Sequence, residues 1–303
     1  MNFIAIIDLG TNTFHLLIAE LNVKRPEIIF QGTIPVKLGE GGMRDGQITA
    51  SAFERGISAL RQFKKNIDHH KAVQVKAVAT SALRSASNGD EFIRQVLAET
   101  GIAIEIIDGN REAELIFSGV RAAINMKDQN SLIMDIGGGS VEFIICDKDQ
   151  IFWKKSFEIG AARLMDQFHK SDPISESNIN ELYSFLNSVL SDLKIQLDIY
   201  KPIQLIGSAG AFETFASMID PEFSILFEKP EFNIELNQFE RIAKFIICSS
   251  HEERAITASI PSVRVDMIVV ATLLTRYVLN LYEFKTLKLS TYSLKEGILF
   301  EMI

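Results

Sequence analysis

The sequence predicts an α/β fold that is built twice, as two domains that face each other across a cleft. Residues 4–11 place four apolar residues before Asp8, followed by an apolar residue, a glycine and a threonine, and residues 132–140 repeat that order around Asp135. Strand-like and helix-like patterns then alternate in both halves, which is typical of α/β domains. The length of 303 residues agrees with two domains of ordinary size.

Each half opens with an expected hairpin, whose tight turn carries glycine and hydroxyl residues. In the first half, a capping-box pattern begins at Ser51, and Gly101 follows a helical pattern that it would end. The expected elements are a strand from Ile4, strands at 15–21 and 28–30, a helix after Ser51, a strand at 73–78, a helix at 88–100, a strand at 102–107 and a helix from Asn110 to Ile124.

The second half repeats the hairpin and then adds helical spacing. Leucines at 182, 186, 193 and 197 predict one long helix. The other expected elements are a strand from Leu132, strands at 141–146, 151–153 and 204–206, and a final helix at 294–303. The segment 122–130 ends in a polar run, and we expect the seam between the halves there.

The composition is that of an ordinary globular protein, with 47% hydrophobic and 23% charged residues. The formal net charge of −8 disfavours a nucleic-acid binder, because neutralising a phosphate backbone requires a basic surface. A phosphate-rich small substrate is still compatible if positive charge gathers locally. We expect Lys37, Arg84 and Arg163 to supply that charge.

The ends and the cysteines indicate a reducing compartment. The N-terminus has no basic segment, and Asp8 interrupts its apolar run, so no signal peptide is expected. No apolar stretch approaches the roughly 18 residues that a membrane helix needs. Cys146 and Cys248 lie far apart and outside any CxxC pattern, which favours free thiols. We therefore expect a cytoplasmic protein that binds neither nucleic acid nor membrane.

The glycine loop after Asp135 is the strongest chemical signal. Three consecutive glycines in an apolar β segment cost stability, which is more easily understood if a ligand approaches the backbone. Unobstructed N–H groups form a concave anion site, and hydroxyl groups add donors. The loop at 10–13 alone is weaker, because a strand ending in Asp-x-Gly is often only a turn. As a repeated pair, the loops predict a phosphate site beside carboxylates that hold a cation or orient water.

Two other residues have both a structural and a functional interpretation. Arg84 follows the expected strand at 73–78, where it would point into the cleft or pair with a surface acid. Glu112 lies in the first turn of an expected helix, where an acid stabilises the helix or faces the cleft. The residues alone leave these alternatives open.

A series of short motifs runs through nearly the whole chain. It consists of IDLGTNTFH at 7–15, KLGEG at 37–41, ATSALR at 79–84, EA at 112–113, DIGGGSVE at 135–142, IGAARL at 159–164, GSAG at 207–210, RVDMI at 264–268 and LKEGIL at 294–299. In this order they resemble the Ppx/GppA phosphatase family, which comprises exopolyphosphatases and guanosine pentaphosphate phosphohydrolases. Each motif is short, but the combination is specific.

The resemblance implies the duplicated domains of the actin-like ATPase superfamily, which are ribonuclease H-like, with an interdomain cleft. It implies a first domain of residues 1–124 plus 294–303 and a second of residues 125–293, because the last helix of the superfamily packs back on the first domain. It also implies a short two-domain form, without the extra helical domain of longer members. The family is often dimeric, so a homodimer is among the expected states.

The resemblance further implies a hydrolase that releases the terminal phosphate of polyphosphate or of guanosine pentaphosphate with Mg²⁺ or another divalent cation. Glu112 matches the catalytic base, and Asp8, Asp135 and Glu142 match metal-associated carboxylates. The implied phosphate-binding residues are Thr11, Asn12, Thr13, Arg84, Gly137, Gly138, Gly139, Ser140, Gly207 and Ser208.

Departures from the family pattern keep other functions open. Val141 replaces a typical threonine, Ala209 lies in a run without the usual second glycine and threonine, and Arg111 and Glu114 exchange the common charges. A catalytically weak protein that senses polyphosphate or guanosine polyphosphates is therefore the alternative. A kinase or ATPase of the same superfamily is disfavoured, because Glu112 suits water as the acceptor. The choice between the two substrates stays open.

Overall fold

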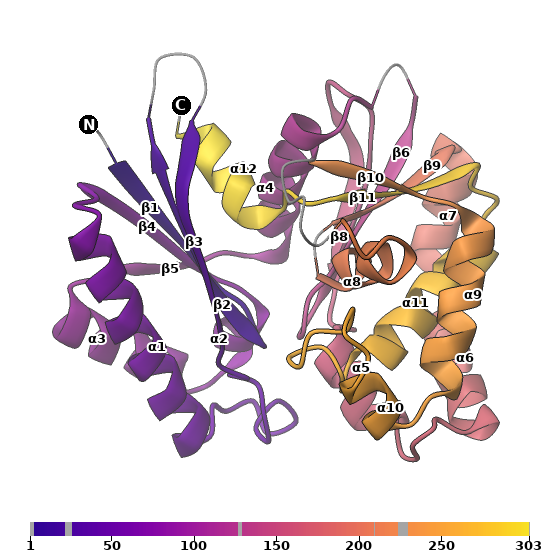
Figure 1. Ribbon diagram of the computed structural model, residues 1–303, viewed down its shortest axis with the longest axis horizontal. Coiled ribbons are helices and arrows are strands. Elements are labelled where there is room, and N and C mark those ends of the chain that lie inside the picture. Colours follow the sequence, from indigo (N-terminus) through magenta and orange to yellow (C-terminus); the bar gives the residue numbers. More distant parts are fainter. Residues whose placement is uncertain (1–2, 22–25, 127–128, 209, 224–229, 303) are drawn as a thin grey trace.

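The computed structural model describes residues 3–21, 26–126, 129–208, 210–223 and 230–302. These residues form two α/β lobes, each built on one sheet (Figure 1). The strand order is β3-β2-β1-β4-β5 in the first sheet and β10-β11-β9-β6-β7-β8 in the second. The predicted mixed α/β class is therefore confirmed.

The two sheets repeat one topology. The first contains β1 (Phe3–Leu9), β2 (Thr13–Glu20), β3 (Glu27–Pro35), β4 (Gln74–Ala79) and β5 (Ile104–Ile106). The second contains β6 (Ser131–Ile136), β7 (Val141–Cys146), β8 (Ile151–Phe157), β9 (Gln204–Ser208), β10 (Glu231–Ile234) and β11 (Thr286–Ser290). β1 pairs antiparallel with β2 and parallel with β4, exactly as β6 pairs antiparallel with β7 and parallel with β9. The sequence repeat thus corresponds to a structural repeat.

The helices lie in layers on both faces of each sheet. Those of the first half are α1 (Ala50–His69), α2 (Ser81–Ser85), α3 (Gly89–Thr100) and α4 (Gly109–Ala123). Those of the second half are α5 (Ala161–Phe168), α6 (Glu176–Val189), α7 (Ser191–Tyr200), α8 (Gly210–Ile219), α9 (Leu236–Cys248), α10 (His251–Ala255), α11 (Ile268–Leu281) and α12 (Leu294–Glu301).

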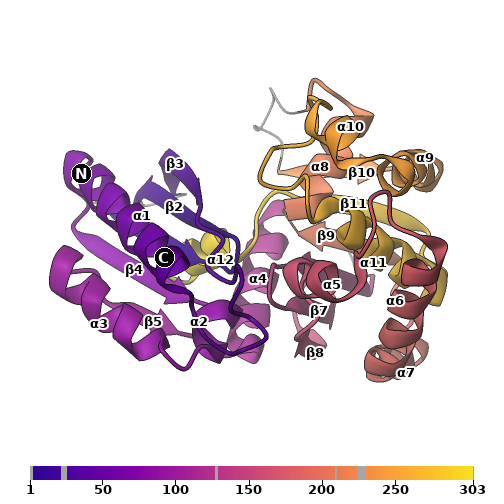
Figure 2. The ribbon, with the colours of Figure 1, turned by 90° about the horizontal axis from the view of Figure 1, so that it is seen from below.

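Helices α4 and α12 lie between the two sheets (Figures 1 and 2). Their apolar side chains share one core with β1, β2 and β4 on one side and with β6, β7 and β9 on the other. The two helices approach closely at Gly119 and Gly297, since a Cβ on Gly297 would lie 1.8 Å from the carbonyl oxygen of Leu115. The last helix thus packs on α4 and β1, while α4 also contacts β7 and β8. The division at residues 124 and 294 stays a prediction.

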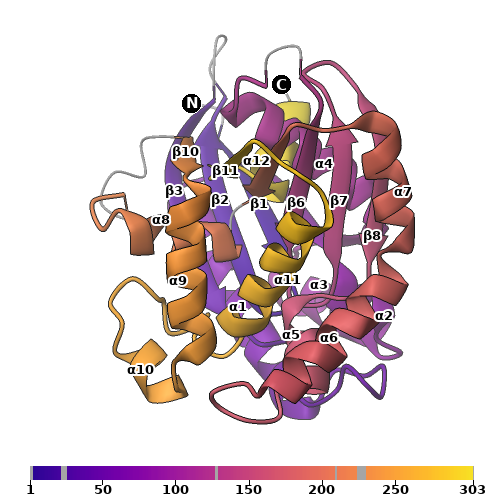
Figure 3. The same cartoon turned by 90° about the vertical axis from the view of Figure 1, so that its right-hand side faces the viewer.

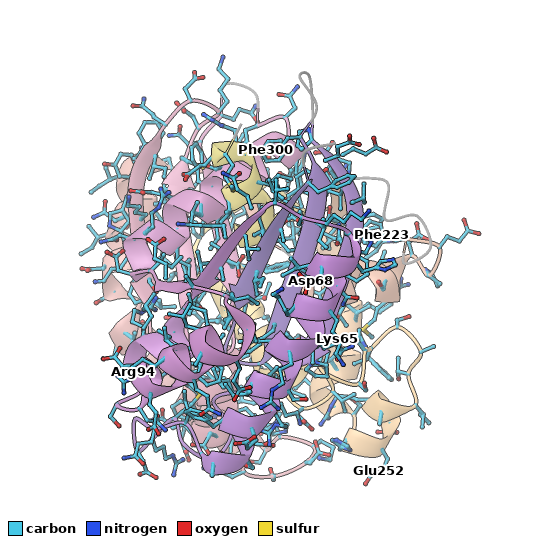
Figure 4. The ribbon with its side chains drawn as sticks, turned by 90° about the vertical axis from the view of Figure 1, so that its left-hand side faces the viewer. Lys65, Asp68, Arg94, Phe223, Glu252 and Phe300 are labelled. Atoms are coloured by element: carbon cyan, nitrogen blue, oxygen red, sulfur yellow. The ribbon has the colours of Figure 1, made fainter. Side chains whose placement is uncertain are left out.

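The outer faces of the sheets are covered by the remaining long helices. α1 and α3 cover the first sheet, with Phe63 and Phe92 in the core. Lys65 and Asp68 on α1 and Arg94 on α3 point outward (Figure 4). Helices α6, α7, α9 and α11 cover the outer side of the second sheet (Figure 3). In the part of the chain that the structure describes, no helix is long and apolar enough to cross a membrane.

The structure corrects three expected helix limits. α1 begins earlier than expected, because Thr49 is its N-cap and accepts from the N–H of Ala52, so Ser51 lies inside the helix. α4 is capped by Asp108, whose carboxylate accepts from the N–H of Arg111, and not by Asn110. The leucine pattern at 182–197 belongs to two helices that break at Leu190. The strand at 102–107 is shorter than expected, at Ile104–Ile106.

Candidate active site

The two glycine loops are equivalent turns. The N–H of Gly10 donates to the carbonyl oxygen of Thr13 at 3.1 Å, and the N–H of Gly137 donates to that of Ser140 at 3.0 Å. The loops also touch each other, because a Cβ on Gly138 would lie 3.0 Å from Cβ of Thr11. Glycine is therefore needed where the loops of the two lobes meet.

The second loop is fixed by its carbonyl groups. The N–H groups of Gly160, Ala161 and Ala162 at the start of α5 donate to the carbonyl oxygens of residues 139, 137 and 138 at 2.9–3.1 Å. The Nε atom of Arg163 donates to the same oxygen of Gly139 at 2.9 Å. A loop held in this way has a defined conformation before any anion arrives, which reduces the cost of binding.

A cavity of about 370 Å³ lies where the loops meet. Among the predicted site residues it is lined by Asp8, Thr11, Asn12, Thr13, Glu112, Asp135, Gly137, Gly138, Gly139 and Ser140. Four helices start at its wall, since the first residues of α5, α8, α11 and α12 line it. Sequence motifs from both halves and from the C-terminal helix therefore converge on one cavity.

Three carboxylates, those of Asp8, Asp135 and Glu142, lie beside the loops. Glu142 is buried, whereas Asp8 and Asp135 are half-buried and line the cavity. Asp135 and Glu142 are directly opposite each other on β6 and β7, so they lie on one face of the sheet. Burial, followed by the charge of Asp135, raises the pKa of Glu142 to about 8. Burial also raises the pKa of Asp8 to about 7 and that of Asp135 to about 6, although Lys295 opposes both shifts. Buried like charges of this kind favour a cation or a shared proton.

Glu112 lies at the start of α4 and is buried with only 7% of its surface exposed. Burial, and then the charge of Glu142, raise the pKa of Glu112 well above its usual value. Arg84 opposes this shift through its charge and through its Nη1 atom, which donates to Glu112 Oε2 at 3.1 Å. The same Nη1 atom also donates to the carbonyl oxygen of Ile107 at 3.1 Å. Glu112 therefore lines the cavity while its carboxylate is held by the guanidinium of Arg84 in α2.

Glu114, an acid two residues after Glu112, faces away from the cavity. It forms ion pairs with Arg111 and with Lys154 on β8, and its pKa is lowered, first by the hydrogen bond from Lys154. Arg111 also pairs with Glu301 on α12. The two charge exchanges relative to the family pattern thus compensate each other, outside the cavity that Glu112 lines.

Several predicted residues lie beside the cavity rather than on its wall. Gly207 is buried in β9, where a Cβ would lie 2.0 Å from the ring of Phe212, so close packing explains this glycine. Ser208 pairs with Asp135 across the sheet and lowers its pKa by a hydrogen bond. Val141 is buried in β7. Ala209 lies outside the described residues, and the roles of Gly207 and Ser208 stay predictions.

Several charged residues of the cavity were not predicted as site residues from the sequence. Lys295 is mostly buried at the start of α12, with 14% of its side chain exposed, and its Nζ atom lies 3.0 Å from Glu296 Oε1. Burial would lower the pKa of Lys295, but nearby acids, above all Glu296, outweigh it and raise the pKa. Arg264 Nη2 lies 2.7 Å from Glu213 Oε2. Lys295 and Arg264 stand in the motifs LKEGIL and RVDMI, which indicated the family but gave neither residue a role in the site.

The cavity is acidic when its side chains are counted. Its acids are Asp8, Glu112, Asp135 and Glu213, and its cations are Arg264 and Lys295. The expected basic residues are paired with acids, since Lys37 contacts Asp266, and Arg84 and Arg163 contact Glu158. A polyanion therefore needs additional positive charge at this site.

A divalent cation fits the donors only in part. Among the described residues, no group of three His, Cys, Asp or Glu side chains is placed to hold a metal ion. Mg²⁺, however, is usually bound by one or two carboxylates together with substrate oxygens and water. The half-buried acids Asp8 and Asp135, both with raised pKa, fit that kind of site.

Comparison with known proteins identifies the family. The family model described as the Ppx/GppA phosphatase family matches residues 17–303. The chain belongs to the Ppx/GppA phosphatase family. The crystal structure of an exopolyphosphatase from Cytophaga hutchinsonii has 43% sequence identity and a TM-score of 0.96, covering 99% of this chain and 97% of that one.

Two other members of the Ppx/GppA phosphatase family are also similar. The Aquifex aeolicus family member has 26% identity and a TM-score of 0.84, covering 99% of this chain and 97% of that one. Exopolyphosphatase 1 of Mycobacterium leprae is 25% identical over 298 residues, 98% of this chain and 88% of its own. Membership confirms the predicted family and a phosphatase, that is, a hydrolase, and the repeated sheets confirm the duplicated α/β fold.

Proposed function

We propose that the protein is an exopolyphosphatase that releases the terminal phosphate of inorganic polyphosphate by attack of water. The observation that carries this proposal is the position of Glu112, which lines the cavity between the two glycine loops and is held by Arg84. The likeness to the Cytophaga hutchinsonii exopolyphosphatase supports polyphosphate as the substrate.

The loops would bind the terminal phosphoryl group. Residues 10–13 and 137–140 present backbone N–H groups, and Thr11 and Ser140 add hydroxyl donors to an anion. Because the carbonyl oxygens of residues 137–139 are anchored to α5, the loop does not reorganise when charge develops. Preorganised donors of this kind are a main source of rate acceleration in phosphoryl transfer.

Glu112 would act as the general base. It accepts a proton from water while the water oxygen forms a bond to the terminal phosphorus. The anhydride P–O bond breaks, and its electron pair stays on the oxygen of the shortened chain, so the products are orthophosphate and polyphosphate shorter by one unit. A carboxylate with a raised pKa is a better match for this proton than an exposed one.

Arg84 would respond to the substrate. Its guanidinium offsets the charge of Glu112 in the free protein. When a phosphoryl group binds beside it, the guanidinium is shared between the phosphate and the base. Glu112 then loses part of the interaction that holds its pKa down, and it accepts the proton of water more readily.

Asp8 and Asp135 are the residues that would hold Mg²⁺ or another divalent cation, with Glu142 beside them on the sheet. When bound, the cation would neutralise phosphate charge. The acid excess among the cavity side chains supports such a requirement. Glu142 is also held by the hydroxyl of Ser156, which donates to Oε1 at 2.6 Å, so its share would be to orient the neighbouring acids.

The proposal is tested by measuring phosphate release from polyphosphate and from guanosine pentaphosphate side by side, with and without Mg²⁺. Glu112→Gln protein, purified in the same way, controls for contaminating phosphatases. Release from polyphosphate by the wild type alone supports the proposal. Release from guanosine pentaphosphate alone would show that this nucleotide, and not polyphosphate, is the substrate. Binding of either polyanion with no release of phosphate overturns the proposal of a hydrolase and favours a sensor protein.

A further inference from the structure

The carboxylate of Glu158 lies among three donors from both lobes. Glu158 stands between β8 and α5 in the second half. Its Oε2 atom accepts from Ser81 Oγ at 2.9 Å and from Arg163 Nη2 at 2.8 Å, and its Oε1 atom accepts from Arg84 Nη2 at 3.3 Å. Ser81 and Arg84 belong to α2 of the first half, so this single carboxylate bridges the lobes.

The three donors adjoin the proposed catalytic groups. Arg163 also donates to the carbonyl oxygen of Gly139, and Arg84 also donates to Glu112. Ser81 lines the active-site cavity, whereas Glu158 and Arg163 line a second cavity of about 850 Å³ that shares Thr11 and Asn12 with the first. One donor therefore lines each cavity, and Arg84 connects them through its contacts with Glu112 and Glu158.

Two guanidinium groups and a hydroxyl around an anion are the donor set that proteins use for phosphate. The carboxylate that now occupies this set is weakly held, since half of the Glu158 side chain is exposed and water screens its ion pairs. A phosphoryl group offers more charge and more acceptor oxygens than a carboxylate does. Exchange of one anion for the other is therefore favourable for a polyanion whose end is already bound.

We propose that Ser81, Arg84 and Arg163 form a second phosphoryl subsite, which Glu158 fills in the free protein and a neighbouring phosphoryl group of the substrate takes in the complex. The proposal rests on the proposed function, because it needs a ligand with more than one phosphoryl group. Glu158 is then a competitor built into the chain. Glu158 disfavours single phosphates, because a phosphate bound at the glycine loops has no second phosphoryl group that could displace Glu158 from the subsite.

The test measures binding without turnover. The probe is imidodiphosphate, whose P–N–P bridge resists hydrolysis, with orthophosphate as the single-phosphate comparison, both titrated calorimetrically at fixed salt. Glu158→Gln removes the competing charge and is expected to bind imidodiphosphate about three- to tenfold more tightly than the wild type, as expected for the loss of weak, screened ion pairs. Orthophosphate affinity is expected to change less.

Matched variants separate the subsite from a general charge effect. Glu99→Gln removes one acid from an exposed ion pair with Arg61 outside both cavities, and it should leave the affinity unchanged. In an Arg163→Gln background, Glu158→Gln should give less than half of the gain in binding free energy for imidodiphosphate that it gives in the otherwise wild-type protein. Glu158→Asp, whose shorter side chain cannot bridge the donors, should also bind more tightly.

Three outcomes overturn the subsite. They are an unchanged or weaker affinity of Glu158→Gln, an equal gain in Glu99→Gln, and a gain that persists in full without Arg163. Melting temperatures of each variant show whether the fold is intact. Because binding is measured without hydrolysis, the two proposals can fail separately. The subsite is supported by tighter binding even if polyphosphate is not cleaved, and cleavage of polyphosphate does not require the subsite.

Discussion

Arg84 Nη1 donates to Glu112 Oε2 at 3.1 Å, and this contact joins α2 to the carboxylate at the start of α4. Both groups are mostly buried, with 21% and 9% of their side chains exposed, so water screens the interaction little. The same guanidinium contacts Glu158 on the other lobe. One side chain thereby couples the proposed base to the proposed second phosphoryl subsite.

Loss of the Glu112 carboxylate should abolish most catalysis. Glu112→Gln is expected to lower kcat for polyphosphate by about 10²–10⁴-fold, because a general base is removed. Glu114→Gln is the matched control, since it removes an acid two residues away that pairs with Lys154. It should keep near-normal kcat and lose at most about 1 kcal/mol of stability. A larger loss of kcat in Glu114→Gln than in Glu112→Gln would show that Glu112 is not the base.

Arg84→Gln should move the pH profile of kcat/KM. Without the guanidinium, burial of Glu112 is opposed by less positive charge, so the pKa of its carboxyl rises further. The base acts only when deprotonated, and the acidic limb of the profile is therefore expected to shift to higher pH, by about 1 to 3 pH units. A parallel fall in activity at every pH would show that Arg84 only binds phosphate.

Gly139→Ala should disturb the contact between the lobes. A Cβ at this position would lie 2.5 Å from Ser81 Oγ and 2.8 Å from Thr11 Oγ1. Overpacking of this kind costs about 1–3 kcal/mol. We expect a lower melting temperature together with a raised KM, because both loops and Ser81 are displaced. Wild-type values of both quantities would show that the loops do not meet as described.

Mg²⁺ should stabilise the folded protein if Asp8 and Asp135 bind it. A ligand that binds only the native state raises the melting temperature in proportion to the logarithm of its concentration above Kd. Asp135→Asn is expected to lose this rise, and chelation should stop phosphate release. An equal Mg²⁺-dependent rise in wild type and Asp135→Asn would place the cation elsewhere on the protein, and no rise in either would show that it binds through the substrate only.

Local patterns predicted much of the fold. The hairpins, the equivalent turns at Gly10 and Gly137, and the C-cap at Gly101, with a φ of 72°, all depend on residues adjacent in the sequence. Helix starts were less well predicted, because Thr49 and Asp108 compete with nearby residues that are equally good caps. Only the geometry of the flanking backbone decides which side chain reaches the free N–H groups.

The charged surroundings of the site could not be predicted from local patterns. Lys295 stands more than 280 residues from Asp8 in the sequence, and only the packing of α12 brings its charge to bear on that acid. Glu158 is a single acid two residues before Gly160, with no spacing that indicates two arginine partners. The glycine loops were predicted from their own residues, and the roles of Arg84 and Glu112 through the family motifs, whereas their mutual contacts required the fold.

Helices α5, α8, α11 and α12 all begin at the wall of the active-site cavity. The peptide dipoles of a helix sum to roughly half a positive elementary charge at its N-terminus. A polyanion entering this acidic cavity thus meets the positive poles of four helices, which a count of lysine and arginine overlooks. Because this potential resides in peptide groups, neither a change of pH nor the substitution of a basic side chain removes it.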